Sequence, residues 1–291
     1  MEYFISQLIN GLSQGAIYAL MAIGFTVVVG VTGLMTFVHG EVIMLGAFAS
    51  YYAFSMFGNN LLIGVVASFI ASWLVGVLIY KVCYERFLYC ADFVPLICTI
   101  GMSMLLKNLA QIIFGPNNKP LLNIVGHSSI SFGKVGVTMV QLIIILTVVA
   151  LCILLFLLLN KTKYGIKLRA VSQDKKAAAL MGIDVQRTAM AGNCLGCGLG
   201  GISGMLLAIY YQTLVATMGG TAGMKAFAAS VLGGLVDIPC AALGGVCLGV
   251  VENIGIMFTS ASFRDIFAFA FLVIMLIIKP EGFAHKKGAR S

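Results

Sequence analysis

Residues 137–160 read VTMVQLIIILTVVALCILLFLLLN and contain no charged side chain. The segment is longer than the ~20 residues that an α-helix needs to cross the hydrocarbon core of a bilayer. Three further runs, residues 3–38, 42–80 and 188–224, are also free of Asp, Glu, Lys and Arg and exceed that length. We therefore predict an all-α integral membrane protein that crosses the bilayer several times.

The composition agrees with this fold class. The chain has 291 residues, of which 60% are hydrophobic and only 10% are charged, and its mean hydropathy is +1.05. These values exclude an ordinary water-soluble domain. The net charge of +8 would suggest nucleic acid as a partner of a soluble protein. Here the basic residues fall in short loops between apolar runs, so we expect a lipid bilayer and no nucleic acid.

The apolar runs and the polar breaks between them predict about nine helices. The turn Gly58-Asn59-Asn60 divides the long run 42–80 into a hairpin. The segment 222–236 is short and is also compatible with a re-entrant or broken helix, which would reduce the number of spans to eight. The expected spans are residues 5–30, 40–57, 61–80, 93–114, 137–160, 188–211, 222–236, 240–259 and 264–279. Together they make one transmembrane domain, residues 1–291.

The distribution of Lys and Arg predicts the orientation of this bundle. Basic residues gather in three segments: residues 81–86, about 161–187, and the tail 280–291. The alternate segments are residues 58–60, 115–136 and 212–221, and together they contain only two lysines. Because basic loops stay in the cytoplasm, we expect a multi-pass membrane protein with its N-terminus outside and its C-terminus in the cytoplasm.

Glycines recur at intervals of four in the apolar segments. The longest series is Gly192, Gly196, Gly200 and Gly204, and shorter pairs are Gly11 with Gly15 and Gly245 with Gly249. Small residues at this spacing allow close approach of helix backbones in lipid. Two interpretations remain open: packing of helices within one subunit, or an interface between subunits.

The basic loop contains a short helix with recognisable ends, in the stretch YGIKLRAVSQDKKAAALMGI at residues 164–183. Ser172 is a suitable N-cap, Asp174 suits the first turn, and Gly182 stands where a left-handed stop is expected. A small apolar face is formed by Ala177, Leu180 and Met181. About ten residues are too few for a stable isolated helix, so we expect it to dock. Its own membrane domain, the lipid surface and a partner protein are the alternatives.

Motifs of catalysis and cofactor binding are missing from the sequence. It contains no metalloprotease, serine-hydrolase or dinucleotide-binding motif. Cys194 and Cys197 form one C-x-x-C without a second pair at zinc-site spacing. The glycines at 126 and 133 are too far apart for a phosphate-binding loop. We therefore predict no catalytic residue, no metal and no cofactor, and any ATP that drives transport must bind to another polypeptide.

Ionisable residues in apolar segments are costly and need an explanation. His39, Glu41 and Asp237 are predicted near the cytoplasmic ends of their spans. Lys225, Arg264 and Asp265 are predicted near outer ends, where interfacial or snorkelling placement would accommodate them. Glu252 lies well inside its span, either in an internal hydrogen-bonded structural role or along a transport path. The candidates for pathway or interior polar residues are His39, Glu41 and Glu252.

Five stretches resemble a known family along the whole length of the chain. They are GLSQGAIYAL at 11–20, FVHGEVIMLGA at 37–47, the loop 168–183, VLGGLVDIP at 231–239 with the glycine-rich run to Glu252, and KPEG at 279–282. In these stretches the sequence is similar to the permease subunits of ABC importers in the branched-chain amino acid (Liv) class, above all to the LivH-type subunit. The resemblance implies transport of branched-chain amino acids across a bacterial inner membrane.

The resemblance also implies partners and a coupling site. The expected partners are a second homologous permease (LivM-like), two cytoplasmic ATPase subunits and an external substrate-binding protein. Residues 177–182 correspond to the family's "EAA" coupling loop, which docks on the ATPase, although Lys176 stands where the motif has Glu. The expected ATPase-coupling residues are Ser172, Asp174, Lys176, Ala177, Ala178, Leu180, Met181, Gly182 and Ile183. From the residues alone, an ATP-independent channel or secondary carrier for a small neutral solute remains the alternative, and sugars, nucleosides and urea-like amides remain alternative substrates.

Overall fold

The computed structural model describes residues 2–87, 93–121, 129–132, 135–235, 237–260, 263–279 and 282–283. In chain order its elements are α1 (Glu2–Thr32), α2 (His39–Phe57), α3 (Leu61–Ile79), the π-helix η1 (Tyr80–Tyr84), α4 (Phe93–Phe114), β1 (Lys119–Pro120), β2 (Ser129–Phe132), β3 (Val135–Thr138), α5 (Met139–Lys161), α6 (Lys163–Gln173), α7 (Lys175–Leu180), α8 (Val185–Tyr211), β4 (Thr213–Leu214), α9 (Met218–Gly233), α10 (Ile238–Phe258) and α11 (Arg264–Ile278).

The predicted polytopic helical membrane fold is confirmed. Within the described residues, seven helices are long and apolar enough to cross a membrane, and they are α1 to α5, α8 and α10. α9 and α11 have 16 and 15 residues, which at 1.5 Å per residue gives roughly 24 and 22 Å. Both are shorter than the ~30 Å hydrocarbon core. The short helix expected at 222–236 is therefore present, whereas 264–279 forms a shorter helix than a full span requires.

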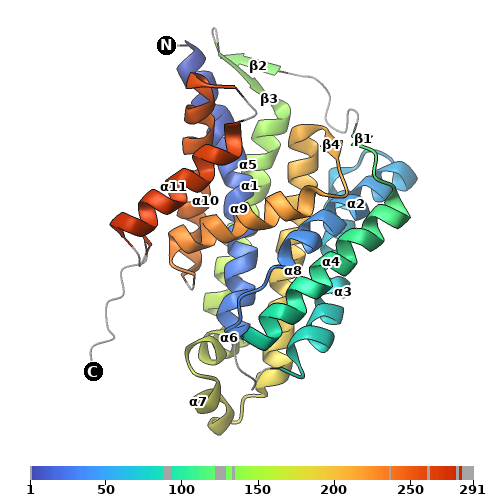
Figure 1. The fold of residues 1–291 in the computed structure, drawn as a ribbon, viewed down its shortest axis with the longest axis vertical. Coiled ribbons are helices and arrows are strands. Elements are labelled where there is room, and N and C mark those ends of the chain that lie inside the picture. Colours follow the sequence, from blue (N-terminus) through green and yellow to red (C-terminus); the bar gives the residue numbers. More distant parts are fainter. Residues whose placement is uncertain are drawn as a thin grey trace.

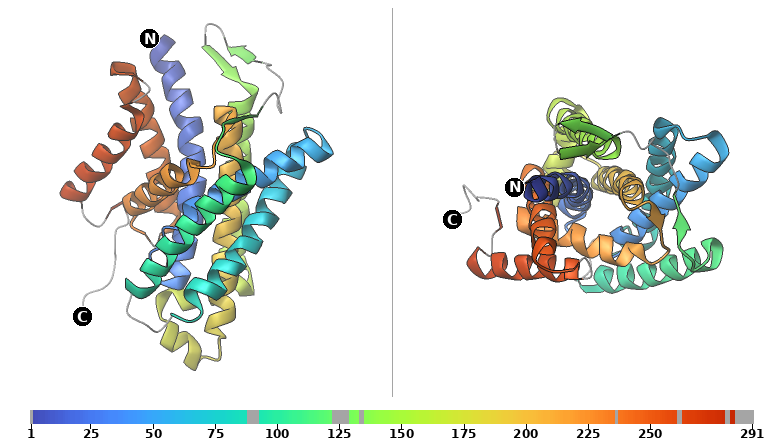
Figure 2. Two further views of the ribbon diagram at one scale, coloured as in Figure 1. Left: turned by 45° about the vertical axis from the view of Figure 1, so that its right-hand side comes forward. Right: turned by 90° about the horizontal axis from the view of Figure 1, so that it is seen from above.

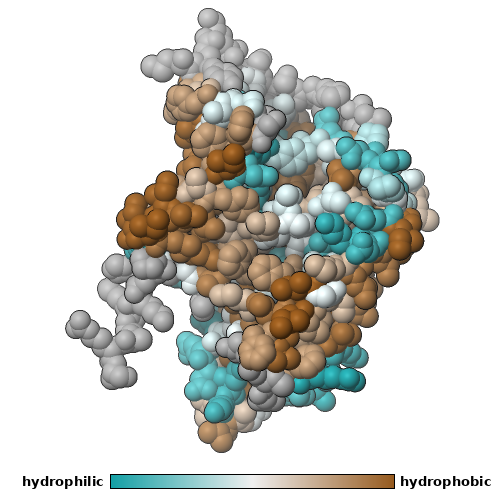
Figure 3. Space-filling view, in the orientation of Figure 1, coloured by the Kyte–Doolittle hydropathy of each residue, from teal (hydrophilic) through white to brown (hydrophobic). Residues whose placement is uncertain are grey.

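The long helices connect two ends of the bundle (Figure 1). The start of α1 and the β2–β3 hairpin lie at one end, and α6 and α7 lie at the other. α5 runs toward α6, and α8 returns to the first end, while α9 crosses the bundle obliquely. Figure 3 shows a hydrophobic band between hydrophilic side chains at the α6–α7 end and others over the upper parts of α2 and α4. This surface pattern is the one expected for a bundle that lipid surrounds at mid-height.

α1 and α8 form the centre of the bundle, as the end-on view in Figure 2 shows. Glycines allow each of these two helices to pack closely against a neighbouring helix. A β-carbon on Gly249 of α10 would lie 2.3 Å from the Cα atom of Gly15 on α1, and one on Gly204 of α8 would lie 2.0 Å from the carbonyl oxygen of Ile43 on α2. The glycine series thus packs helices of the same chain, which is the first of the two interpretations.

Two small antiparallel sheets in the described residues lie mostly in segments that the sequence indicated as loops, although the end of β3 falls in the expected span 137–160. β2 pairs with β3, and β1 pairs with β4 through Lys119↔Leu214 and Pro120↔Thr213. The second pairing joins the segment after α4 to the segment after α8. These two loops therefore lie at the same end of the bundle, as the alternation of basic and non-basic loops predicts.

Candidate functional site

The segment between α5 and α8 forms two short helices instead of the single helix expected. Asp174 separates them in an extended conformation, with φ −153°. Its Oδ1 atom accepts hydrogen bonds from the backbone N–H groups of Lys176 (2.8 Å) and Ala177 (3.1 Å). Asp174 is therefore the N-cap of α7 rather than a first-turn residue. Ser172 is not the N-cap, because it lies within α6 and its hydroxyl donates to the carbonyl oxygen of Arg169 at 2.9 Å.

The end of α7 confirms the predicted stop at Gly182. This residue has φ +76°, a conformation that favours glycine because it has no β-carbon. The N–H of Gly182 donates to the carbonyl oxygen of Ala179 at 3.0 Å, and the N–H of Ile183 donates to that of Ala178 at 3.1 Å. This pair of bonds is a Schellman motif, which satisfies the last carbonyl groups of the helix. Both ends of the six-residue helix are thus capped.

α7 contacts the membrane domain through one side only. Ala178 is buried, and Lys175 donates from Nζ to the carbonyl oxygen of Thr32 at the end of α1. Leu180 and Met181 are 89% and 83% exposed, and Ala177 and Lys176 are exposed as well. The apolar face expected to dock is therefore not buried within this chain. It projects from the end of the bundle opposite the chain's start (Figure 1).

His39 and Glu41 lie at the start of α2, but this helix end is inside the bundle and not at the cytoplasmic end, as was predicted. α1 ends at Thr32, and residues 33–38 return alongside it with alternating exposed and buried side chains, as an extended strand does. The ring of His39 approaches Gly24 of α1 and Gly200 of α8. Gly24 is eight residues before the end of α1, and Gly200 is fifteen after the start of α8, which correspond to roughly 12 and 22 Å along the helices. Irregular backbone at this depth is tolerated where protein buries it or where it lines a cavity.

A cavity of about 180 Å³ lies beside the start of α2. Its lining comes from α1, α2, α4, α9 and the returning segment, and consists of Phe25, Thr36, Phe37, His39, Gly40, Glu41, Ser103, Gly220, Gly223, Met224 and Phe227. Glu41 is only 2% exposed. Its Oε1 atom accepts a long hydrogen bond of 3.4 Å from Ser103. Its Oε2 atom has no hydrogen-bond partner in the described part of the chain, and neither ring nitrogen of His39 makes a hydrogen bond of good geometry there.

Glu252 lies in a different place, at the centre of a buried network of charges. Its Oε1 atom is 3.0 Å from Nζ of Lys225 and 3.2 Å from Nε of Arg264, and it accepts a hydrogen bond of 3.1 Å from Gln14. Lys225 also pairs with Asp265 at 2.8 Å. The side chain of Lys225 is 8% exposed, so it is buried by ion pairing and does not snorkel as predicted. Its Oε2 atom has no hydrogen-bond partner in the described part of the chain. The contacts of Oε1 favour the structural interpretation of Glu252.

The comparison with known proteins agrees with this architecture. Residues 7–276 match the family described as "Branched-chain amino acid transport system / permease component". The chain belongs to this permease family. It is 34% identical to the high-affinity branched-chain amino acid transport system permease protein LivH of Escherichia coli K12, with 96% of this chain and 95% of the relative covered. It is 31% identical to the corresponding protein BraD of Pseudomonas aeruginosa, with the same coverage.

Similarity extends to an archaeal relative. The permease is 28% identical to the probable branched-chain amino acid transport permease protein LivH of Methanocaldococcus jannaschii, with 89% of this chain and 83% of the relative covered. The sequence-based interpretation as a transport permease is therefore confirmed. The roles of individual residues stay predictions.

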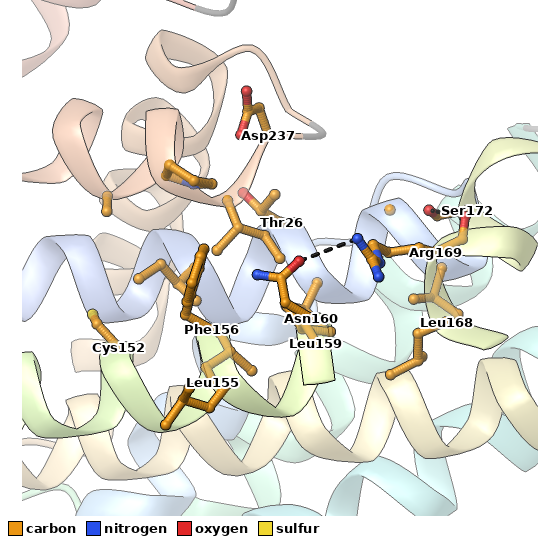
Figure 4. A pocket seen from close by; sticks show the side chains of 18 of the residues that line it. Thr26, Cys152, Leu155, Phe156, Leu159, Asn160, Leu168, Arg169, Ser172 and Asp237 are labelled. Carbon is orange, nitrogen blue, oxygen red and sulfur yellow. Dashed lines mark hydrogen bonds between the residues drawn. The ribbon is translucent and has the colours of Figure 1, made fainter. Parts of the chain in front are cut away.

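A larger cavity of the permease, about 560 Å³, lies between α1, α5, α6 and the start of α10. Figure 4 shows the apolar side chains of Leu155, Phe156 and Leu159 along its wall and the Asn160–Arg169 hydrogen bond at one end. In that bond, Nη1 of Arg169 donates to Oδ1 of Asn160 at 3.1 Å. A wall of this kind suits apolar groups and offers no unpartnered buried charge to a polar solute.

Several residues of the two polar sites escaped the sequence analysis. Gln14 and Tyr18 contact Glu252 from α1, and Ser103 contacts Glu41 from α4. Their partners are far away in the sequence, so spacing could not reveal them. One local signal was available for the cavity at Glu41: the pair Gly219-Gly220 opens a helix too short to span, as broken helices at membrane binding sites do.

Proposed function

We propose that this permease is the membrane subunit of an ATP-driven ABC importer for branched-chain amino acids. It would receive substrate from an external binding protein and pair with a second, homologous permease. Two cytoplasmic ATPase subunits would supply the driving force, with one of them contacting α7. The observation that carries this proposal is the capped helix α7, whose Leu180 and Met181 side chains are left exposed at the end of the bundle.

The physical reason lies in the cost of that exposure. A six-residue helix is not stable alone, and two large apolar side chains in water forgo roughly 1.5–3 kcal/mol each of burial free energy. Docking against an apolar groove of another protein would recover part of it. The capping bonds of Asp174 and Gly182 hold the short helix as a rigid unit, so it could transmit a displacement of the ATPase to α6 and α8.

The orientation of the proposed importer follows from charge. Lys161, Lys163 and Lys167 lie at the same end of the bundle as α7. Basic segments are retained on the cytoplasmic side of a membrane. This supports a cytoplasmic α7 and an outer N-terminus, in the inner membrane of a bacterial cell.

The substrate assignment rests on the relatives, whose names specify branched-chain amino acids. It is tested by uptake of labelled leucine in cells with and without the chain, in the presence of unlabelled ribose, a nucleoside or urea as competitors. We expect uptake to require the chain and ATP, and to resist all three competitors. Uptake that persists after ATP depletion would contradict the proposal and support a channel or secondary carrier instead.

Coupling to an ATPase is tested by purifying the tagged chain from its native membrane. We expect an ATPase to co-purify with the wild type, and Leu180→Asp with Met181→Asp to reduce its yield at least tenfold, because two charges enter an apolar contact. Met56→Asp is the matched control, since Met56 is 77% exposed next to the end of α2, and this end lies away from α7 (Figure 1). Equal recovery of ATPase with the double variant and the control would refute the role of α7.

A further inference from the structure

The start of α2 and the start of α9 meet at the cavity beside Glu41. A β-carbon on Gly40 would lie 2.1 Å from the carbonyl oxygen of Gly219, and one on Gly219 would lie 2.5 Å from Oε2 of Glu41. Only glycine allows these two helix starts to approach so closely. The contact places a carboxylate next to the N-terminal end of α9, where the helix dipole stabilises negative charge. Oε2 of Glu41 therefore lies against the start of α9.

The carboxylate of Glu41 is not neutralised by an ion pair in the described part of the chain. Lys107, one turn after Ser103 on α4, is near enough to attract it electrostatically but is not part of the cavity wall. Oε2 therefore remains an unpartnered acceptor on a residue that lines the cavity and is 2% exposed. A buried acceptor of this kind requires a donor, and a cationic donor satisfies a carboxylate best.

The rest of the cavity offers a different environment. Phe25, Phe37 and Phe227 supply aromatic wall. The cavity is open to the surface, because Phe37 and Met224 at its edge are 49% and 53% exposed. Gly220 faces open space there, with no atom of the described chain within 4 Å of a β-carbon placed on it. A solute could therefore enter with one charged end and one apolar end.

We propose that this cavity is a binding site for the transported amino acid within the membrane. The α-ammonium group of the substrate donates to Oε2 of Glu41, and its aliphatic side chain lies against the phenylalanines. This inference rests on the proposed function as an amino acid importer and adds the residues that recognise the substrate along its path. Placement at the start of a short helix, inside the bilayer, is common for substrate sites of membrane transporters.

The chemistry favours an ammonium group over other ligands. Sugars and urea carry no positive charge to balance an isolated carboxylate at this depth, and an anion would be repelled by it. A free inorganic cation would satisfy Glu41 but would gain nothing from the three phenylalanines. An amino acid with an apolar side chain offers a cationic donor to Glu41 and an aliphatic group to the phenylalanines.

The test compares Glu41→Gln with the wild type in the complete transporter. The variant keeps the size of the side chain and removes the charge. We expect the maximal rate of labelled leucine uptake to fall at least tenfold, which corresponds to about 1.4 kcal/mol. The stimulation of ATP hydrolysis by the substrate-loaded binding protein should persist, because α7 and the outer surface are unchanged. Equal uptake by Glu41→Gln and the wild type would overturn the inference.

Two further variants separate substrate recognition from other roles of Glu41. If Glu41 served only to balance Lys107, the double variant Glu41→Gln, Lys107→Gln would regain wild-type uptake, and this result would overturn the inference. Gly220→Val should reduce uptake by narrowing the cavity. Gly101→Val is its matched control, since Gly101 is also helical with no described atom within 4 Å of its β-carbon position but lies outside the cavity wall. Equal uptake by both glycine variants would count against the site.

Failure of the inference is distinguishable from failure of the proposed function. If the wild-type transporter imports no leucine beyond the level of cells that lack the chain, the proposed function is wrong and the inference falls with it. If the wild type imports leucine and Glu41→Gln does so equally well, only the inference is wrong. The amount of each variant in the membrane, measured by immunoblot, confirms that uptake is compared at equal abundance.

Discussion

Replacing Glu252 with Gln should destabilise the protein, because it removes the common partner of two cations. Lys225 and Arg264 carry two positive charges, and Glu252 and Asp265 carry two negative charges, so the wild-type network is neutral. Glu252→Gln leaves one uncompensated positive charge. The side chain of Glu252 is 0% exposed and that of Lys225 is 8% exposed, so water cannot solvate the excess charge efficiently.

The magnitude follows from this burial. Removing one partner of a buried ion pair costs roughly 3–5 kcal/mol. The cost should be lower here, about 2–3 kcal/mol, because Asp265 still pairs with Lys225 and is 52% exposed, and because Gln retains hydrogen-bonding capacity. With roughly 2–4 °C per kcal/mol for chains of 150–250 residues, we expect the apparent Tm in detergent to fall by roughly 4–12 °C.

The assay is thermal denaturation of the purified chain in detergent, followed by the loss of the monodisperse peak in size-exclusion chromatography. The double variant Lys225→Met, Glu252→Gln restores neutrality, and we expect it to recover at least half of the lost Tm. A pathway role for Glu252 makes the opposite prediction. If Glu252→Gln changed Tm by less than about 1 °C and abolished uptake, the structural interpretation of this network would be refuted.

Two further substitutions test the C-terminal end of α7 and the packing of α8 against α2. Gly182→Val should leave membrane insertion intact but uncouple ATP hydrolysis from uptake, because a β-branched side chain is strained at φ +76°. Gly182→Asn, which tolerates this conformation, should retain coupled uptake, and equal behaviour of the two variants would contradict the argument. Gly204→Val should reduce the yield of folded protein several-fold, because its β-carbon would lie 2.0 Å from the carbonyl oxygen of Ile43. Chromatography of a fluorescent fusion measures that yield, and a yield equal to that of Gly101→Val would count against this packing.

Features that depend on neighbouring residues could be predicted accurately. The long apolar runs predicted the spanning helices because the thickness of a bilayer fixes the length of such a run. Gly182 was identified as the end of α7 because a left-handed stop is a local requirement. The cap at the start of α7 was assigned to the wrong residue. Ser172 and Asp174 are both good caps, and the choice depended on where α6 ends.

The positions of ionisable residues in depth could not be predicted in the same way. His39 and Glu41 follow the first apolar run, which suggested a helix end. The return of residues 33–38 alongside α1 carries them into the bundle instead. Lys225 was expected at an interface, and its actual place depends on Glu252, which is 27 residues away. A charge in an apolar segment shows that some partner is needed, but it does not show which one.

By itself, the sequence determined the membrane location, the helical class, the alternation of basic and non-basic loops and the presence of a capped helix between α5 and α8. Hydrophobic length, charge and local backbone preference act over a few residues or a single span. These four features can therefore be predicted from the sequence alone. Only the tertiary structure decided that Glu252 is enclosed by four other polar side chains and that Glu41 faces a cavity with one oxygen unpartnered. Both outcomes depend on how glycines let distant helices approach, and that proximity exists only after the chain has packed.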